Sequence, residues 1–220
     1  MNTKQNIIQD LFIEYGILNS DLTVNKSKKG SKIESILTNA KKGLKQYLSI
    51  QRCLHLTNPS KDILFQEMFS NFYGIRFKDI SWKKEYFTLL EISKEQKKDF
   101  GEILKILYTK TNTVDASFSS KLLATINPNL PVIDKWIRIN LSINEEYQEI
   151  SALEDISDRL KKTENFYNKL VDIFEEFIPT EGAKNIFDYF NLKYPYTNIT
   201  ETSKITKVKI LDLILWQLRD

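Results

Sequence analysis

The chain has 220 residues, of which 41% are hydrophobic and 12% aromatic, so we expect a well-filled core rather than a disordered protein. Its net charge of +3 permits nucleic-acid binding without requiring it. One cysteine and one histidine exclude an internal disulfide and argue against zinc sites and a serine–histidine triad. We expect no metal ion and no other cofactor.

No apolar run approaches the ~20 residues of a membrane span. The first twelve residues, MNTKQNIIQDLF, carry Asp10 within their apolar part and offer no small-residue cleavage site, which is not typical of a signal peptide. We therefore expect a soluble cytoplasmic protein with no membrane partner. Neither GxxxxGK[ST] nor GxGxxG occurs, so no nucleotide cofactor is expected.

Six glycines and five prolines are too few for a turn-rich β architecture and favour helices. Apolar residues at helical spacing predict a short helix that ends at Gly16, followed by a polar loop over residues 19–31. A long helix then follows, which a capping box of Ser31 and Glu34 opens and which Asn58-Pro59 ends.

The next elements are also expected to be helices. Ser60 is the predicted cap of a shorter helix that Gly74 closes. Residues 75–92 are ambiguous, because most suit a helix while residues 75–77 could be extended. A second capping box, Ser93 with Gln96, predicts the start of a further helix with a clear apolar face.

The last third of the chain completes an all-α pattern. Helices are predicted over residues 156–177, over residues 183–190 and from about Ser203, the last being apolar around so much of its surface that it should be buried. We expect a compact multi-helix globular fold with residues 1–220 as a single helical unit. An arrangement as two helical lobes around a cleft is the alternative.

Residues 115–141, DASFSSKLLATINPNLPVIDKWIRINL, carry the functional signal. Asp115 can cap a helix, and the NPNLP stretch predicts a rigid connection because both prolines fix φ and resist helix formation. Asp134 then stands where it can cap the following helix. The predicted unit is a helix, a stiff connection and an aspartate at the start of the next helix.

This segment resembles a motif of uncharacterised bacterial proteins that reads roughly SF(A/S)SK, a hydrophobic residue, ATINP and PVxD. More distantly, residues 95–145 resemble the core of the helix-hairpin-helix DNA glycosylase superfamily. In that superfamily a lysine lies on the second hairpin helix, and a catalytic aspartate follows a proline–valine pair at the start of a later helix.

The resemblance implies a set of site residues. Lys121 matches the Schiff-base lysine, and Asp134 matches the catalytic aspartate with one residue inserted after Pro131-Val132. Contacts to DNA are expected from residues on either side of this pair, and an aromatic residue is expected to stack on the flipped base. The expected DNA contacts are Ser119, Ser120, Lys135 and Arg138, and the stacking candidates are Trp136, Tyr108 and Trp82.

The chemistry of base excision requires these residue types. Cleavage of an N-glycosidic bond builds positive charge on the sugar, which a carboxylate in a desolvated site stabilises. A lysine amine with a lowered pKa can attack C1′ and form a covalent imine. The chain departs from the superfamily pattern in two respects: Phe118-Ser119-Ser120 replaces the usual glycines, and Asp134 follows Lys121 after only 13 residues.

Ordinary structural roles remain open for the same residues. Asp134 could serve only as a helix cap worth ~1 kcal/mol, Lys121 could be a solvated surface lysine, and Trp136 could belong to the core or to an interface. The leading hypothesis is a DNA glycosylase or lyase. The alternatives are a non-catalytic helical module of a mobile-element or phage-defence system, which binds DNA or protein through the same cleft, and a purely structural partner protein.

Overall fold

The computed structural model describes residues 6–26, 31–198 and 205–218. Within these ranges every regular element is a helix, and the only strand-like pairing is one isolated bridge between Leu18 and Val24. The predicted all-α class is therefore confirmed. None of the described helices combines the length and apolar character needed to span a membrane.

The helices follow one another through short connections. In chain order they are α1 (Ile7–Glu14), α2 (Lys32–Leu56), α3 (Ile63–Tyr73), η1 (Ile75–Phe77), α4 (Ile80–Glu95), α5 (Phe100–Thr111), α6 (Ala116–Ile126), α7 (Lys135–Asn140), α8 (Asn144–Ser151), α9 (Ile156–Phe177), α10 (Glu181–Lys193), η2 (Pro195–Asn198) and α11 (Lys207–Gln217).

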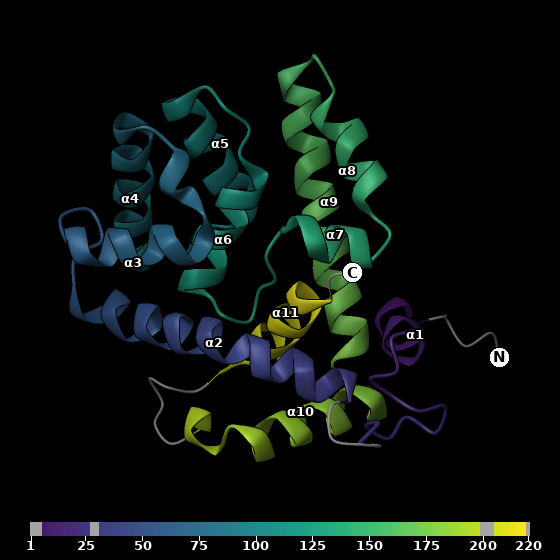
Figure 1. Cartoon of the computed structure of the whole chain (residues 1–220). Coiled ribbons are helices and arrows are strands. Elements are labelled where there is room, and N and C mark those ends of the chain that lie inside the picture. The colour runs from purple at the N-terminus through teal and green to yellow at the C-terminus, as the bar shows by residue number, and fades with distance from the viewer. Residues whose placement is uncertain (1–5, 27–30, 199–204, 219–220) are drawn as a thin grey trace.

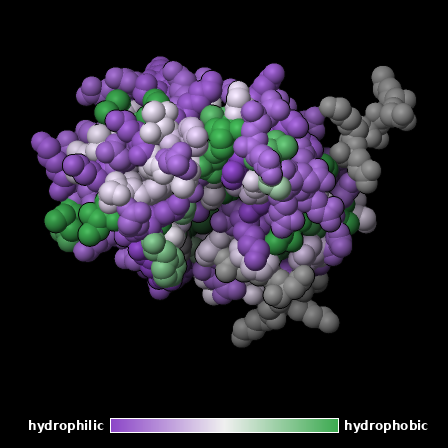
Figure 2. Space-filling model, turned by 90° about the horizontal axis from the view of Figure 1, so that it is seen from above, coloured by the Kyte–Doolittle hydropathy of each residue, from purple (hydrophilic) through white to green (hydrophobic). Residues whose placement is uncertain are grey.

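The helices form two groups (Figure 1). The first lobe consists of α3–α6, and the second lobe consists of α1 and α7–α11. The long helix α2 runs under the first lobe and into the second, where α10 lies below it in Figure 1. It packs against α3 and against α11, while α5 packs against α9. Buried hydrophobic residues from both lobes form one continuous core. Seen from above, the largely hydrophilic surface is furrowed between the two groups (Figure 2).

Two predicted helix starts are wrong because aspartates, rather than serines, provide the caps. Ser31 is the N-cap residue of α2, as predicted, although its side chain makes no capping hydrogen bond, and Asp62 rather than Ser60 caps α3. The expected box at Ser93 and Gln96 is wrong, since Ser93 lies inside α4. The capping box is formed instead by Asp99 and Glu102 at the start of α5.

Other boundaries agree with the sequence pattern. Gly74 ends α3 in the left-handed conformation, with φ of 75°. The ambiguous stretch after it forms two helices, first η1 and then α4. The last helix begins at Lys207 and is almost fully buried, as expected. The proposed start near Ser203 lies outside the described residues.

Asn140 ties the short helix α7 to the end of α11. Its side-chain amide donates to the carbonyls of Leu215 and Leu218, at 2.8 and 2.9 Å, in a buried position. Asn140→Ala leaves both carbonyls without this donor, and we expect a loss of about 2 kcal/mol in the free energy of unfolding. Urea denaturation measures the loss. The exposed Gln148→Ala on α8 should change stability by less than about 0.5 kcal/mol, and an equally small change in Asn140→Ala would contradict the assignment.

Candidate active site in the inter-lobe cleft

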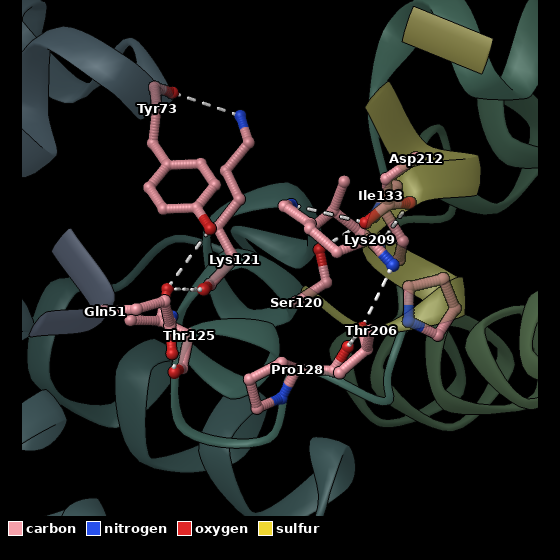
Figure 3. A network of polar contacts seen from close by, with 12 residues as sticks. Gln51, Tyr73, Ser120, Lys121, Thr125, Pro128, Ile133, Thr206, Lys209 and Asp212 are labelled. Carbon is pink, nitrogen blue, oxygen red and sulfur yellow. Dashed lines mark hydrogen bonds and ion pairs between the residues drawn. The ribbon is translucent and has the colours of Figure 1, made fainter. Parts of the chain in front are cut away.

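The connection between α6 and α7 is anchored at several points. The Ser120 hydroxyl accepts a hydrogen bond from the Ile133 amide at 2.8 Å, and the Tyr167 hydroxyl donates to the Pro131 carbonyl at 3.1 Å. Thr206 donates to the Pro128 carbonyl from the start of α11 (Figure 3). Both lobes therefore hold the proline-containing segment, and its end, where Asp134 lies, has a fixed position relative to α6.

Lys121 projects from α6 alongside the ring of Tyr73 (Figure 3). Its Nζ donates to the Tyr73 carbonyl at 3.2 Å and lies 5.0 Å from the centre of the Phe118 ring. Burial lowers the pKa of the Lys121 amine; the charge of Asp134 opposes this shift and the charge of Lys209 adds to it. Lys121 is thus a half-buried amine rather than a freely solvated surface lysine.

Asp134 caps α7, as the sequence indicated. Its Oδ1 accepts a hydrogen bond from the Trp136 amide at 2.9 Å, and the residue is half-buried. The same carboxylate raises the pKa of Lys121 and lines the same cleft as that lysine. The structural role and a chemical role are compatible at this residue.

Lys121 and Asp134 line the same cleft, which has a volume of about 780 Å³. The cleft lies between α2, the end of α3, η1, the start of α7 and α11. This volume is within the usual range for small-molecule sites. Basic side chains outnumber acidic ones in its lining, with Lys42, Arg76, Lys121 and Lys209 against Asp134 and Asp212. The surplus favours an anionic ligand.

A second pair of charged groups, Lys209 and Asp212, was missed from the sequence. Both are buried on α11, with Lys209 Nζ 3.3 Å from Asp212 Oδ2. Asp212 Oδ1 also lies 3.5 Å from the Val132 amide. A usable signal was present, because charged residues at spacing three inside an otherwise apolar helix are seldom buried unless they are paired.

Burial dominates the electrostatics of this pair. Loss of solvent raises the pKa of Asp212 to about 6, although Lys209 acts in the opposite direction. Burial alone would lower the pKa of Lys209, but the side chains of Tyr73 and Asp212 shift it upward overall. The Lys209 ammonium also lies 5.1 and 5.7 Å from the ring centres of Tyr47 and Tyr73.

The expected stacking aromatics do not line the cleft. Trp82 is buried and donates from its indole nitrogen to Asp115 at 2.9 Å, and neither Trp136 nor Tyr108 contributes to the lining. The exposed aromatic residues of the cleft are Phe77, with 85% of its surface accessible, and Trp216, with 38%. These two rings are the better candidates for stacking on a planar ligand.

Two of the expected DNA contacts are incompatible with the structure. Ser119 and Ser120 are completely buried, because α6 begins at Ala116 and turns both residues inward. The hydroxyl of Ser120 also accepts a hydrogen bond from the Ile133 amide. Lys135 is exposed on α7, whereas Arg138 stacks on Tyr147 at 3.8 Å. Lys135 and Arg138 lie outside the cleft lining.

The hairpin between α5 and α6 contains no glycine. Asn112 adopts the left-handed conformation there, with φ of 54°, a role that asparagine tolerates better than most residues. Asp115 at the start of α6 accepts hydrogen bonds from Lys78, Trp82 and Thr113. The Phe118-Ser119-Ser120 stretch lies within α6 rather than in the hairpin turn.

Among the described residues, no group of three or more histidine, cysteine or acidic side chains comes together to hold a metal ion. Comparisons of the chain with protein-family models, with curated proteins and with solved structures gave no match. The assignment of the candidate site therefore depends on the positions and contacts of its own residues.

The raised pKa of Asp212 has a direct spectroscopic consequence. In a ¹³C NMR titration, its side-chain carboxyl should titrate with a midpoint near pH 6, and Lys209→Met should move that midpoint higher because it removes the opposing positive charge. Between the ordinary value of 3.8 and about 6, the native state holds a proton that the unfolded state releases. The contribution of Asp212 to the free energy of unfolding should therefore fall as pH rises through this window. A midpoint near 4 would contradict its desolvation.

Proposed function

We propose that the protein is a DNA glycosylase or lyase that acts on a base flipped out of the duplex, with Lys121 as nucleophile and Asp134 as the stabilising carboxylate. The observation that carries the proposal is the shared cleft: an amine whose pKa is lowered by burial and a carboxylate line one concave surface. The resemblance of residues 95–145 to helix-hairpin-helix glycosylases selected the same two residues.

The chemistry needs a neutral amine at the start of the reaction. A lowered pKa increases the fraction of Lys121 present as the free amine at neutral pH, and a neutral amine can donate one N–H to the Tyr73 carbonyl while its lone pair stays available. That lone pair attacks C1′ as the bond from C1′ to the base breaks, and the base leaves with the bonding electrons.

Asp134 would act on the charge that develops during this step. Its carboxylate stabilises the positive charge on the sugar and on the nitrogen that has become bonded to C1′, and it can accept a proton from that nitrogen. The nitrogen lone pair then expels O4′ from C1′, the protonated Asp134 returns its proton to O4′, and the ring opens to leave a protonated imine between Lys121 and C1′. The departing base takes up the proton that its nitrogen requires from solvent or from a neighbouring acid.

The rest of the cleft suits the same ligand. A flipped nucleotide presents a flat base and a phosphate backbone, and Phe77 and Trp216 offer exposed rings at the cleft. Lys42 and Arg76 supply exposed positive charge from α2 and η1. Contacts of this kind make binding weaken as salt rises.

Borohydride trapping on abasic-site DNA tests the nucleophile. Reduction of an imine links protein and DNA covalently, so the wild-type protein should give an adduct and Lys121→Ala should give none. Lys161→Ala is the matched control, because this lysine is exposed on α9 and lies outside the cleft lining. Failure of the wild-type protein to form an adduct, or an adduct that survives in Lys121→Ala, would reject the proposed chemistry.

Asp134→Asn separates the chemical role of the carboxylate from its capping role. Asparagine caps a helix about as well as aspartate, so the free energy of unfolding in urea should change by less than about 0.5 kcal/mol. The rate of adduct formation should fall about 100-fold, because the charge that stabilises the transition state is lost. If neither the rate of adduct formation nor the free energy of unfolding changes, Asp134 serves only as a helix cap.

The second candidate is a helical module without catalytic activity that binds DNA through the same cleft. It is favoured by the roles that both residues already have in the fold, since Asp134 caps α7 and Lys121 binds the Tyr73 carbonyl. Salt-sensitive binding of abasic-site DNA with no trapped adduct would support this reading over the enzyme.

A further inference from the structure

The buried pair on α11 has no part in the chemistry described above, yet it lies in the same cleft. Lys209 is 4% exposed and Asp212 is 3% exposed. A buried ion pair contributes little to stability compared with apolar residues of similar size. Stability alone therefore does not account for two charges in the middle of this apolar helix.

Tyr73 connects this pair to Lys121. Its carbonyl accepts from Lys121 Nζ at 3.2 Å, and its ring centre lies 5.7 Å from Lys209 Nζ. Asp212 reaches the Val132 amide, two residues before Asp134. One tyrosine thus contacts both lysines, and the partner of the second lysine reaches the segment that carries the carboxylate.

We propose that Lys209 is a positioning residue whose positive charge favours the neutral form of the Lys121 amine, and that Asp212 limits this effect by partly neutralising Lys209. A catalytic effect of Lys209 rests on the proposed function, but the protonation of Lys121 can be measured without DNA. A second cation in a poorly solvated site disfavours protonation of the first. Burial is the main cause of the lowered pKa of Lys121; Asp134 opposes the shift, and Lys209 adds to it.

Other charged groups around Lys121 act in both directions. Those that line its cleft or share its contact with the Phe118 ring are Lys42 on α2, Tyr73 on α3, Arg76 on η1, Lys78 before α4 with its partner Asp115, Asp134 before α7, and the two residues of α11. Lys42 and Arg76 are solvent-exposed, and the charge of Lys78 is offset by Asp115 at 3.0 Å. Lys209 is the buried cation of this set with the clearest influence on Lys121.

The protonation of Lys121 can be read from its reactivity. The folded protein is labelled with a small acylating reagent across a pH series, and mass spectrometry follows the peptide that contains Lys121, with exposed Lys161 as an internal reference. The wild-type midpoint for Lys121 should lie below the ordinary lysine value of 10.5. Lys209→Met should raise the Lys121 midpoint by about one pH unit, because it removes a positive neighbour.

Asp212→Asn should have the opposite effect while Lys209 stays protonated, since it then leaves Lys209 without its counter-charge and lowers the Lys121 midpoint further; loss of the Lys209 proton as pH rises should reduce this effect. The double variant Lys209→Met with Asp212→Asn leaves no unpaired buried charge, so it remains testable if a single variant fails to fold. Its midpoint should lie above the wild-type value and below that of Lys209→Met. Unchanged midpoints in Lys209→Met and in the double variant would overturn the inference.

The two proposals fail in different ways. Shifted labelling midpoints without any trapped DNA adduct would retain the influence of Lys209 and reject the glycosylase function. A trapped adduct whose pH profile is the same in the wild-type protein and in the double variant would retain the function and reject the role of Lys209.

Discussion

The stiff connection between α6 and α7 is the constraint on which the cleft depends. Prolines at positions 128 and 131 limit its conformations, and hydrogen bonds from Tyr167 and Thr206 hold its carbonyls. Ser120 completes the attachment by accepting from Ile133 within the core. Because this segment is held on several sides, an aspartate and a lysine that are separated by a helix end and a turn are presented to the same space. A flexible connection would leave their separation undefined.

The electrostatics of the cleft follow from the burial of its inner charged groups. Burial favours the neutral forms of both Lys121 and Asp212, while their charged neighbours adjust each shift. The cleft therefore contains groups whose protonation changes nearer to neutral pH than it would in water, which is a recurrent property of sites that transfer protons. Low solvation also strengthens the interaction of these buried groups with a charged ligand.

The sequence indicated the helical class, the rigid bend and the position of Asp134, because proline and capping residues act locally. It misjudged Ser119 and Ser120, since only the start of α6 at Ala116 determines which side of that helix faces inward. Lys209 and Asp212 were missed because the prediction for this helix relied on the pattern of its many apolar residues and did not consider the few charged residues among them. The exposure of Phe77 depends on how η1 lies against the neighbouring helices, which is a tertiary property.

The long helix α2 has a mechanical consequence for the cleft. It is one continuous helix of 25 residues that contacts α3 in the first lobe and α11 in the second, and it supplies residues to the cleft lining. Because one helix packs against both groups, a hinge motion that separates them would have to break its packing against α3 or against α11. Adjustment of shape on binding is thereby left largely to the incoming ligand.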